Sequence, residues 1–178
     1  MRRRTPPPGS PDDEQAELQR GAARTNYAGA VYGSLLAASV VAGTGTPGGP
    51  LPRIQLVVLL LITGVVFWAT HVYTGLVGDR LRHRPLSRRE VRAVCVHESP
   101  IIKAAIPPAA AVAISPLLEL GPSGTVWLGL IVAVAEQVGW ATAAVVHAGA
   151  SRRLILATGA VNLLLGLVIV AFKTALQH

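Results

Sequence analysis

Five long apolar stretches occupy most of this chain, and they limit the folds it can adopt more than any other feature. They cover about residues 26–41, 56–77, 100–118, 126–147 and 154–176. A helix of about 20 apolar residues crosses the ~30 Å hydrocarbon core of a bilayer, because each residue adds about 1.5 Å. We therefore predict an all-α, polytopic membrane helix bundle over residues 25–178, with five transmembrane helices at these positions.

Composition and charge agree with this class of protein. Hydrophobic residues make up 51% of the chain and charged residues 14%, whereas soluble domains carry about 25% charged residues. The net charge of +7 would also suit a nucleic-acid-binding protein. However, the arginines cluster beside the apolar stretches, as they do in proteins held at an anionic membrane surface. The predicted partners are the lipid bilayer and anionic lipid headgroups at its cytoplasmic face, with no nucleic acid.

The arginines also predict an orientation. With five spans, thirteen of the fourteen arginines lie on one side, and only Arg53 lies on the other. Cytoplasmic loops of membrane proteins carry the excess of arginine and lysine. The N-terminus is therefore predicted to be cytoplasmic. Residues 1–24 are polar and contain several prolines, so we expect a disordered cytoplasmic tail, with at most a short helix at 12–20.

A basic segment between the second and third spans contains a helix-start signal. Ser87 and Glu90 have the spacing of a capping box, in which each side chain binds the backbone amide of the other residue. We predict a short amphipathic helix over 88–97 that lies on the cytoplasmic surface. Three of its arginines would contact lipid headgroups, namely Arg88, Arg89 and Arg92. In the third span, Pro107, Pro108 and Pro116 predict a kink or a break.

Small residues repeat every four positions in the first span, at Gly29, Gly33 and Ala37. This spacing places them on one helix face, where they would allow a neighbouring backbone to approach closely. We predict that this face packs against another helix. A homo-oligomer formed through the same face is an alternative.

Glu136 is the most unusual polar residue, because it lies near the middle of the fourth span. A carboxylate at the bilayer centre costs about 2.5–3.5 kcal/mol or more. It could belong to a proton-linked or cation-linked site, or it could join helices as a protonated hydrogen-bonding group. The fourth and fifth spans form a hairpin that turns near residue 150, so Asn162 should lie at the depth of Glu136 and Gln137. We predict a polar seam of these three residues.

His71 is a second candidate within the membrane, and Thr74 lies close to it in the sequence. A histidine can relay protons, although a neutral histidine bonded to a backbone carbonyl is equally consistent with the sequence. His147 is predicted on the same helix face as Glu136. Lys103 and Lys173 lie near span ends and should extend to the headgroups. We expect no catalytic residue, metal site or cofactor, because no specific spacing of such residues occurs.

Three stretches resemble small, uncharacterised integral membrane proteins of actinobacteria. They are residues 68–78 (WATHVYTGLVG), 97–108 (HESPIIKAAIPP) and 160–173 (AVNLLLGLVIVAFK). The resemblance covers roughly residues 24–178 and implies a membrane fold, with no activity to transfer. It places the chain in a bacterial cytoplasmic membrane as a multi-pass protein.

The sequence leaves two leading functions open, with a membrane enzyme as a third candidate. The first is transport or permeation of protons, ions or a small solute, with Glu136 and His71 lining a hydrated cavity. The alternative is a non-catalytic membrane assembly or partner-binding subunit, in which the same residues only hydrogen-bond neighbouring helices.

Overall fold

A computed structural model describes residues 11–46, 49–80 and 87–176, with side chains described over 27–44, 51–78 and 87–175. Ten elements follow in chain order: α1 (Pro11–Gly43), β1 (Gly45–Thr46), β2 (Gly49–Pro50), α2 (Arg53–Arg80), α3 (Arg88–His97), α4 (Ser99–Lys103), α5 (Ile106–Ile114), the 3-10 helix η1 (Ser115–Leu118), α6 (Pro122–His147) and α7 (Arg152–Leu176). The described chain is therefore almost entirely helical. The exception is a two-residue antiparallel pairing of β1 with β2 in the loop before α2.

Four helical segments among the described residues are long and apolar enough to cross a membrane. They are Arg53–Gly78, Ser99–Leu118, Pro122–His147 and Arg152–Ala175. The prediction of a helical chain suited to a multi-pass membrane protein is confirmed to this extent. The first predicted span corresponds to Tyr27–Gly43, which is apolar but shorter, so a fifth crossing remains a prediction.

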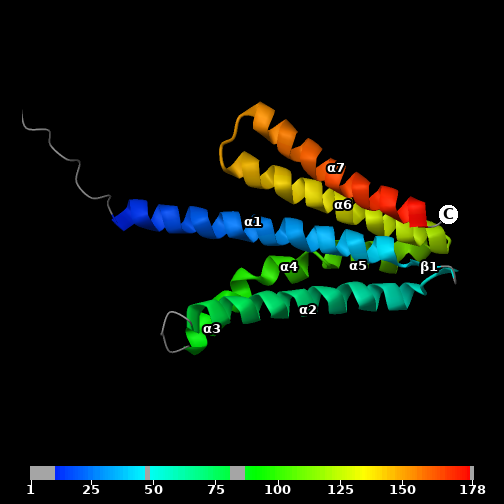
Figure 1. Ribbon diagram of the computed structural model, residues 1–178, viewed down its shortest axis with the longest axis horizontal. Coiled ribbons are helices and arrows are strands. Elements are labelled where there is room, and N and C mark those ends of the chain that lie inside the picture. The colour runs from blue at the N-terminus through cyan, green and yellow to red at the C-terminus, as the bar shows by residue number, and fades with distance from the viewer. Residues whose placement is uncertain (1–10, 47–48, 81–86, 177–178) are drawn as a thin grey trace, which may run out of the picture.

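Helix α1 lies between the two halves of the bundle (Figure 1). The α6–α7 hairpin is on one side of it, and α2, α4 and α5 are on the other. Burial agrees with this central place, because Ser34, Ala38 and Val41 are fully covered. The Ser34 hydroxyl donates to the carbonyl of Ala30, which satisfies the polar group inside the bundle.

The structure differs from the predicted disordered tail over residues 11–24, because α1 begins at Pro11. Proline fits the first helical turn, and three acidic residues, Asp12, Asp13 and Glu14, follow it where the helix dipole favours negative charge. This polar part also continues from an apolar helix, so it needs no separate nucleation. The residues before Pro11 lie outside the described part of the chain.

The third predicted span is broken, as its prolines predict. Helix α4 ends at Lys103 and α5 begins at Ile106, with a proline in the first turn of α5. Pro116 likewise lies in the first turn of η1. Proline has no amide hydrogen and clashes with the preceding turn, which accounts for both interruptions.

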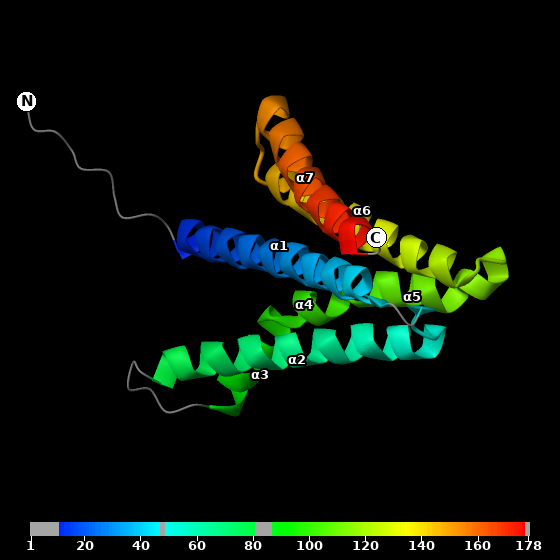
Figure 2. The ribbon, with the colours of Figure 1, turned by 45° about the vertical axis from the view of Figure 1, so that its right-hand side comes forward.

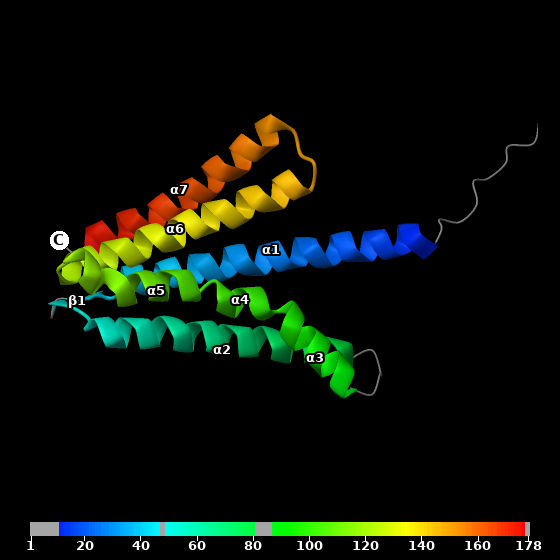
Figure 3. The ribbon, with the colours of Figure 1, turned by 180° about the vertical axis from the view of Figure 1, so that it is seen from behind.

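Helix α3 begins as expected. The amide of Glu90 donates to Ser87 Oγ at 3.2 Å, and the amide of Ser87 donates to Glu90 Oε2 at 2.8 Å. None of the residues of α3 is buried. The indole of Trp68 in α2 donates to the carbonyl of Cys95 at 3.0 Å, which fixes α3 beside α2 (Figure 3). Its position on a membrane surface remains a prediction.

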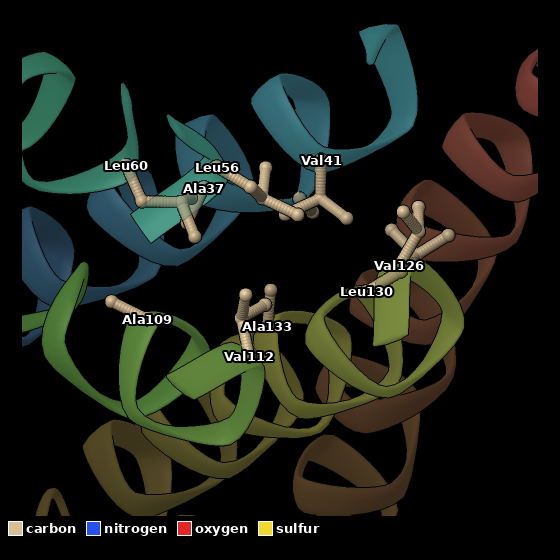
Figure 4. Close-up of a cluster of buried hydrophobic side chains, with 10 residues drawn as sticks. Ala37, Val41, Leu56, Leu60, Ala109, Val112, Val126, Leu130 and Ala133 are labelled. Carbon is tan, nitrogen blue, oxygen red and sulfur yellow. The ribbon is translucent and has the colours of Figure 1, made fainter. Parts of the chain in front are cut away.

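The hydrophobic core lies towards one end of the bundle. It combines side chains from the end of α1, the start of α2, α5 and the first half of α6, among them Val41, Leu56, Val112, Val126 and Leu130 (Figure 4). This end carries the loops with few arginines. Towards the other end, the α6–α7 hairpin diverges from α1 (Figure 2). The helices are therefore packed tightly at the arginine-poor end and spread apart at the arginine-rich end.

Small residues bring α1 close to α4. A Cβ atom added at Gly33 would lie 2.7 Å from the carbonyl oxygen of Ile101 and 2.8 Å from the Cβ of Ala104. Gly29 faces Ile101 and Pro100 at ordinary contact distance, and Ala37 lies in the core. The small-residue face thus packs within its own chain. A homo-oligomer through this face would have to displace α4.

Replacing Gly33 with alanine should destabilise the protein by about 1–3 kcal/mol, because the added methyl group would overlap backbone atoms that have little room to move. Gly139→Ala is the matched control, since Gly139 lies in the middle of α6 with nothing within 4 Å of an added Cβ. Unfolding in mixed micelles would measure both variants. Equal stability of the two would contradict the close α1–α4 contact.

Candidate functional site

Glu136 lies in the middle of α6, and its two carboxylate oxygens have different surroundings. Oε1 accepts a hydrogen bond from Nε1 of Trp140, one turn further along, at 3.0 Å. Oε2 is buried, with no hydrogen-bond partner in the described part of the chain. The Trp140 bond holds the carboxylate in place, and Oε2 remains free to accept a hydrogen bond from a donor that enters the site.

This carboxylate faces a cleft of about 510 Å³ between α1, α4, the start of α5 and α6. Most of the lining is apolar or small. The residues with polar or aromatic side chains are Tyr27, Ser99, Lys103, Glu136 and Trp140. The volume falls within the range of about 300–1,000 Å³ that is usual for small-molecule sites. A small ligand in this cleft could therefore contact the Glu136 side chain.

Tyr27 closes one side of the cleft and connects α1 to α6. Its ring centroid lies 5.9 Å from that of Trp140 and 5.6 Å from that of His147. His147 is exposed, and its Nδ1 lies 2.8 Å from the carbonyl of Ala143. His147 is therefore placed near Glu136 along α6, as predicted, but it supports Tyr27 from outside the cleft.

Lys103 brings a second charge to the cleft. Its side chain is exposed at the end of α4, and within the described residues it forms no hydrogen bond or ion pair. Its position near a span end predicts only contact with lipid headgroups. Lys103 follows Ser99 by four residues, so the two lie on one face of a helix. This spacing is the sequence feature that could have predicted a shared site. The cleft thus holds a lysine and a glutamate that do not pair with each other.

The predicted polar seam is only partly formed. Gln137 is fully buried, and its Nε2 lies 3.4 Å from both the carbonyl oxygen and Oδ1 of Asn162. Asn162 in turn donates to the carbonyl of Thr158. Glu136 does not join them, because adjacent helical residues point about 100° apart. Gln137 and Asn162 connect α6 to α7, whereas Glu136 faces the cleft.

His71 is not part of this site. Its Nδ1 lies 3.0 Å from the carbonyl of Phe67, and its ring packs 5.3 Å from that of Tyr32. Thr74 donates to the carbonyl of His71 itself. His71 lies on α2 and does not line the cleft at Glu136. Within the described residues, its ring contacts the Phe67 carbonyl of its own helix and the Tyr32 ring of α1.

The mouth of the cleft adjoins the basic face of α3. Arg89 and Arg92, with Ala93, Val96 and His97, line a shallow groove, and Val96 also lines the cleft. Arg88 is exposed beside them. These arginines stand where an anionic group approaching the cleft would meet them, and their contact with lipid headgroups remains a prediction.

A polar cluster closes the opposite end of the bundle. The guanidinium of Arg53 donates to the carbonyl of Leu120 and, from Nε at 3.4 Å, to Oγ1 of Thr125. Thr125 donates to the hydroxyl of Ser115 at 2.9 Å, and both of these side chains are buried. In the sequence, Arg53 is only the exception to the arginine pattern. In the structure, its hydrogen bonds connect the start of α2 with the start of α6 and the residues after η1.

Among the described residues, no group of three or more histidine, cysteine, aspartate or glutamate side chains is placed to hold a metal ion. No family model, no curated protein and no solved structure matches this chain. The resemblance to actinobacterial membrane proteins therefore remains a prediction.

Replacing Thr125 with valine should destabilise the protein by about 1–3 kcal/mol, because the buried Ser115 hydroxyl loses the hydrogen bond that Thr125 donates and Nε of Arg53 loses an acceptor. Thr142→Val is the matched control. The Thr142 hydroxyl bonds only the Val138 carbonyl of its own helix, so its loss should cost less than about 0.5 kcal/mol. Chemical unfolding in micelles would measure the stability of both variants. Similar losses of stability in the two would contradict a stabilising role for the polar cluster of Arg53, Ser115 and Thr125.

Proposed function

We propose that this chain is a small multi-pass protein of the bacterial cytoplasmic membrane that admits a proton, an ion or a small polar solute through the cleft at Glu136. The observation that carries the proposal is a carboxylate in the middle of a membrane-length helix that lines a cleft of about 510 Å³ and has one buried oxygen without a hydrogen-bond partner among the described residues. Carboxylates at this depth usually face a bundle interior or a water-filled cavity and mark an ion or substrate pathway.

The uneven packing of the bundle supports this function. The hydrophobic core and the Arg53 cluster close the arginine-poor end, whereas the cleft reaches residues at the start of α4 and the end of α3 near the arginine-rich end. A site that is open to one side and closed to the other has the form needed for alternating access.

The orientation proposed for this site depends on five crossings. Helix α1 is included as a span because its apolar part, 27–43, packs against α4 and α6 in the interior of the bundle. At about 1.5 Å per residue, these residues cover roughly 25 Å, close to the hydrocarbon thickness. With α1 as a span, the arginine-rich end faces the cytoplasm, and the cleft opens there.

Replacing Glu136 with glutamine should lower proton or monovalent cation uptake into proteoliposomes by roughly tenfold or more, because the variant loses the charged acceptor in the cleft. Glu119→Gln is the control, since Glu119 is an exposed carboxylate in the turn after η1. Uptake would be followed with a pH-sensitive dye inside the vesicles. The transport proposal is wrong if the parent protein gives no flux above empty liposomes, or if Glu136→Gln transports like Glu119→Gln.

The five-span arrangement predicts a labelling pattern in a Cys95→Ser background. A cysteine at Ala148, which is exposed between α6 and α7, should react with a membrane-impermeant maleimide only in inverted vesicles. A cysteine at Gln55, exposed in the first turn of α2, should react only in spheroplasts. An N-terminal epitope tag should behave like position 148. A tag that behaves like position 55 would show that α1 does not cross the membrane.

The alternative, a non-catalytic assembly or partner-binding subunit, has one specific observation in its favour. Polar groups elsewhere in the membrane-length helices bind the chain itself: His71 and Thr74 bond within α2, and Gln137 bonds to Asn162. Such bonds join or stabilise helices without any ligand. An absence of flux in the parent protein would favour this alternative.

A further inference from the structure

We infer that the cleft binds a zwitterion, a molecule that carries one ammonium group and one acidic group, with the ammonium placed at Glu136 and the acidic group at Lys103. This inference rests on the proposed function and names the class of solute. Its starting observation is that two opposite charges line one cleft and do not pair with each other.

The inner part of the cleft suits an ammonium group. Oε2 of Glu136 is a buried acceptor without a partner in the described residues, and the rings of Tyr27 and Trp140 lie beside it. A carboxylate oxygen accepts strong charge-assisted hydrogen bonds, and aromatic faces attract cations. An ammonium group supplies the donors and the positive charge that these groups can bind.

The broken third span adds further acceptors at the same place. Pro107 and Pro108 have no amide hydrogen, so the carbonyls of Lys103 and Ala104 lack the donor that a continuous helix would supply four residues later. Lys103, Ala104 and Pro107 all line the cleft. Helix breaks inside membrane proteins are tolerated where they line a cavity, and unwound carbonyls there coordinate cations.

The outer part of the cleft suits an acidic group. Lys103 is exposed and unpaired, and the neighbouring groove carries Arg89 and Arg92. The cleft and the groove beside it therefore hold the basic side chains of Arg89, Arg92 and Lys103 together with the acidic Glu136. A simple cation would be repelled by the basic mouth, and a simple anion would be repelled by Glu136. A zwitterion that enters with its ammonium group first meets the complementary charge at both ends.

Two sources could supply this chemistry. One is a free amino acid with an apolar side chain, which the small and apolar residues of the lining would accommodate. The other is the headgroup of an aminophospholipid that enters sideways from the bilayer. Each carries an ammonium group and an acidic group a few bonds apart. Separate binding experiments distinguish the free amino acid from the lipid.

The free-solute arm uses L-leucine and its two single-charge analogues, 3-methylbutylamine and 4-methylpentanoate. Binding is measured by calorimetry on the full-length protein in nanodiscs made only of phosphatidylglycerol. We expect L-leucine to bind at least about tenfold more tightly than either analogue, because each analogue lacks one of the two charge-assisted contacts. Glu136→Gln and Lys103→Gln should each weaken L-leucine binding by about tenfold, whereas Glu136→Asp and Lys103→Arg should retain most of it.

The lipid arm uses native mass spectrometry of the protein extracted from mixed phosphatidylethanolamine and phosphatidylglycerol vesicles. Retention of phosphatidylethanolamine by the parent, with loss in both Glu136→Gln and Lys103→Gln, would assign the site to the lipid headgroup. Glu119→Gln serves as the control in both arms, and thermal unfolding of each variant checks that it is folded.

The inference is overturned if neither L-leucine nor phosphatidylethanolamine binds, or if the single-charge analogues bind as tightly as L-leucine. It is also overturned if Lys103→Gln binds like the parent, which would limit recognition to a cation at Glu136. Proton flux that depends on Glu136, without zwitterion binding, would leave the proposed function standing and remove this inference alone.

Discussion

The close approach of α1 to α4 at Gly33 is the contact on which the arrangement of the other helices depends. Gly33 has no side chain, so the backbone of α1 lies so close to α4 that an added Cβ would be only 2.7 Å from the Ile101 carbonyl oxygen. Helix α1 can then occupy the middle of the bundle, in contact with both the α2–α5 half and the α6–α7 hairpin. Lipid provides no hydrophobic drive for helices to associate, so such close packing must supply the attraction. Larger side chains here would move α4 away from α1 and would remove one wall of the cleft.

Packing is concentrated at the arginine-poor end, and this unevenness has a physical cause. Val41, Leu56, Val112 and Leu130 come from four helices and meet beside short loops that hold these helices together. The Arg53 cluster adds hydrogen bonds between α2, η1 and α6 at the same end. Further along the bundle, Glu136 and Lys103 line the same cleft and do not form an ion pair with each other. Carboxylate and ammonium groups keep hydration or a ligand more readily than they enter a dry contact, so the helices there remain further apart.

The sequence predicted the elements better than the site, because different interactions determine the two. Hydropathy and proline positions depend on local residues, and they located the four long apolar helices and the break before Ile106. The equal depth of Gln137 and Asn162 in the α6–α7 hairpin also predicted that these two residues lie together, as their hydrogen bond shows. Depth alone does not give the direction of a side chain, and for that reason Glu136 was grouped with Asn162 and His71. The pairing of Arg53 with Thr125 depends on how separate helices pack, which no single segment encodes.

The break between α4 and α5 connects the fold to the proposed binding chemistry. A continuous helix would satisfy every carbonyl of the third span within itself and would present only side chains to the cleft. Pro107 and Pro108 remove the amide donors that a continuous helix would offer to the carbonyls of Lys103 and Ala104, and these residues line the same cleft as Glu136 of α6. A bilayer interior makes unpaired acceptors costly, at several kcal/mol for each group in hydrocarbon. A hydrogen-bond donor bound in the cleft, such as the proposed ammonium group, would give these acceptors a partner.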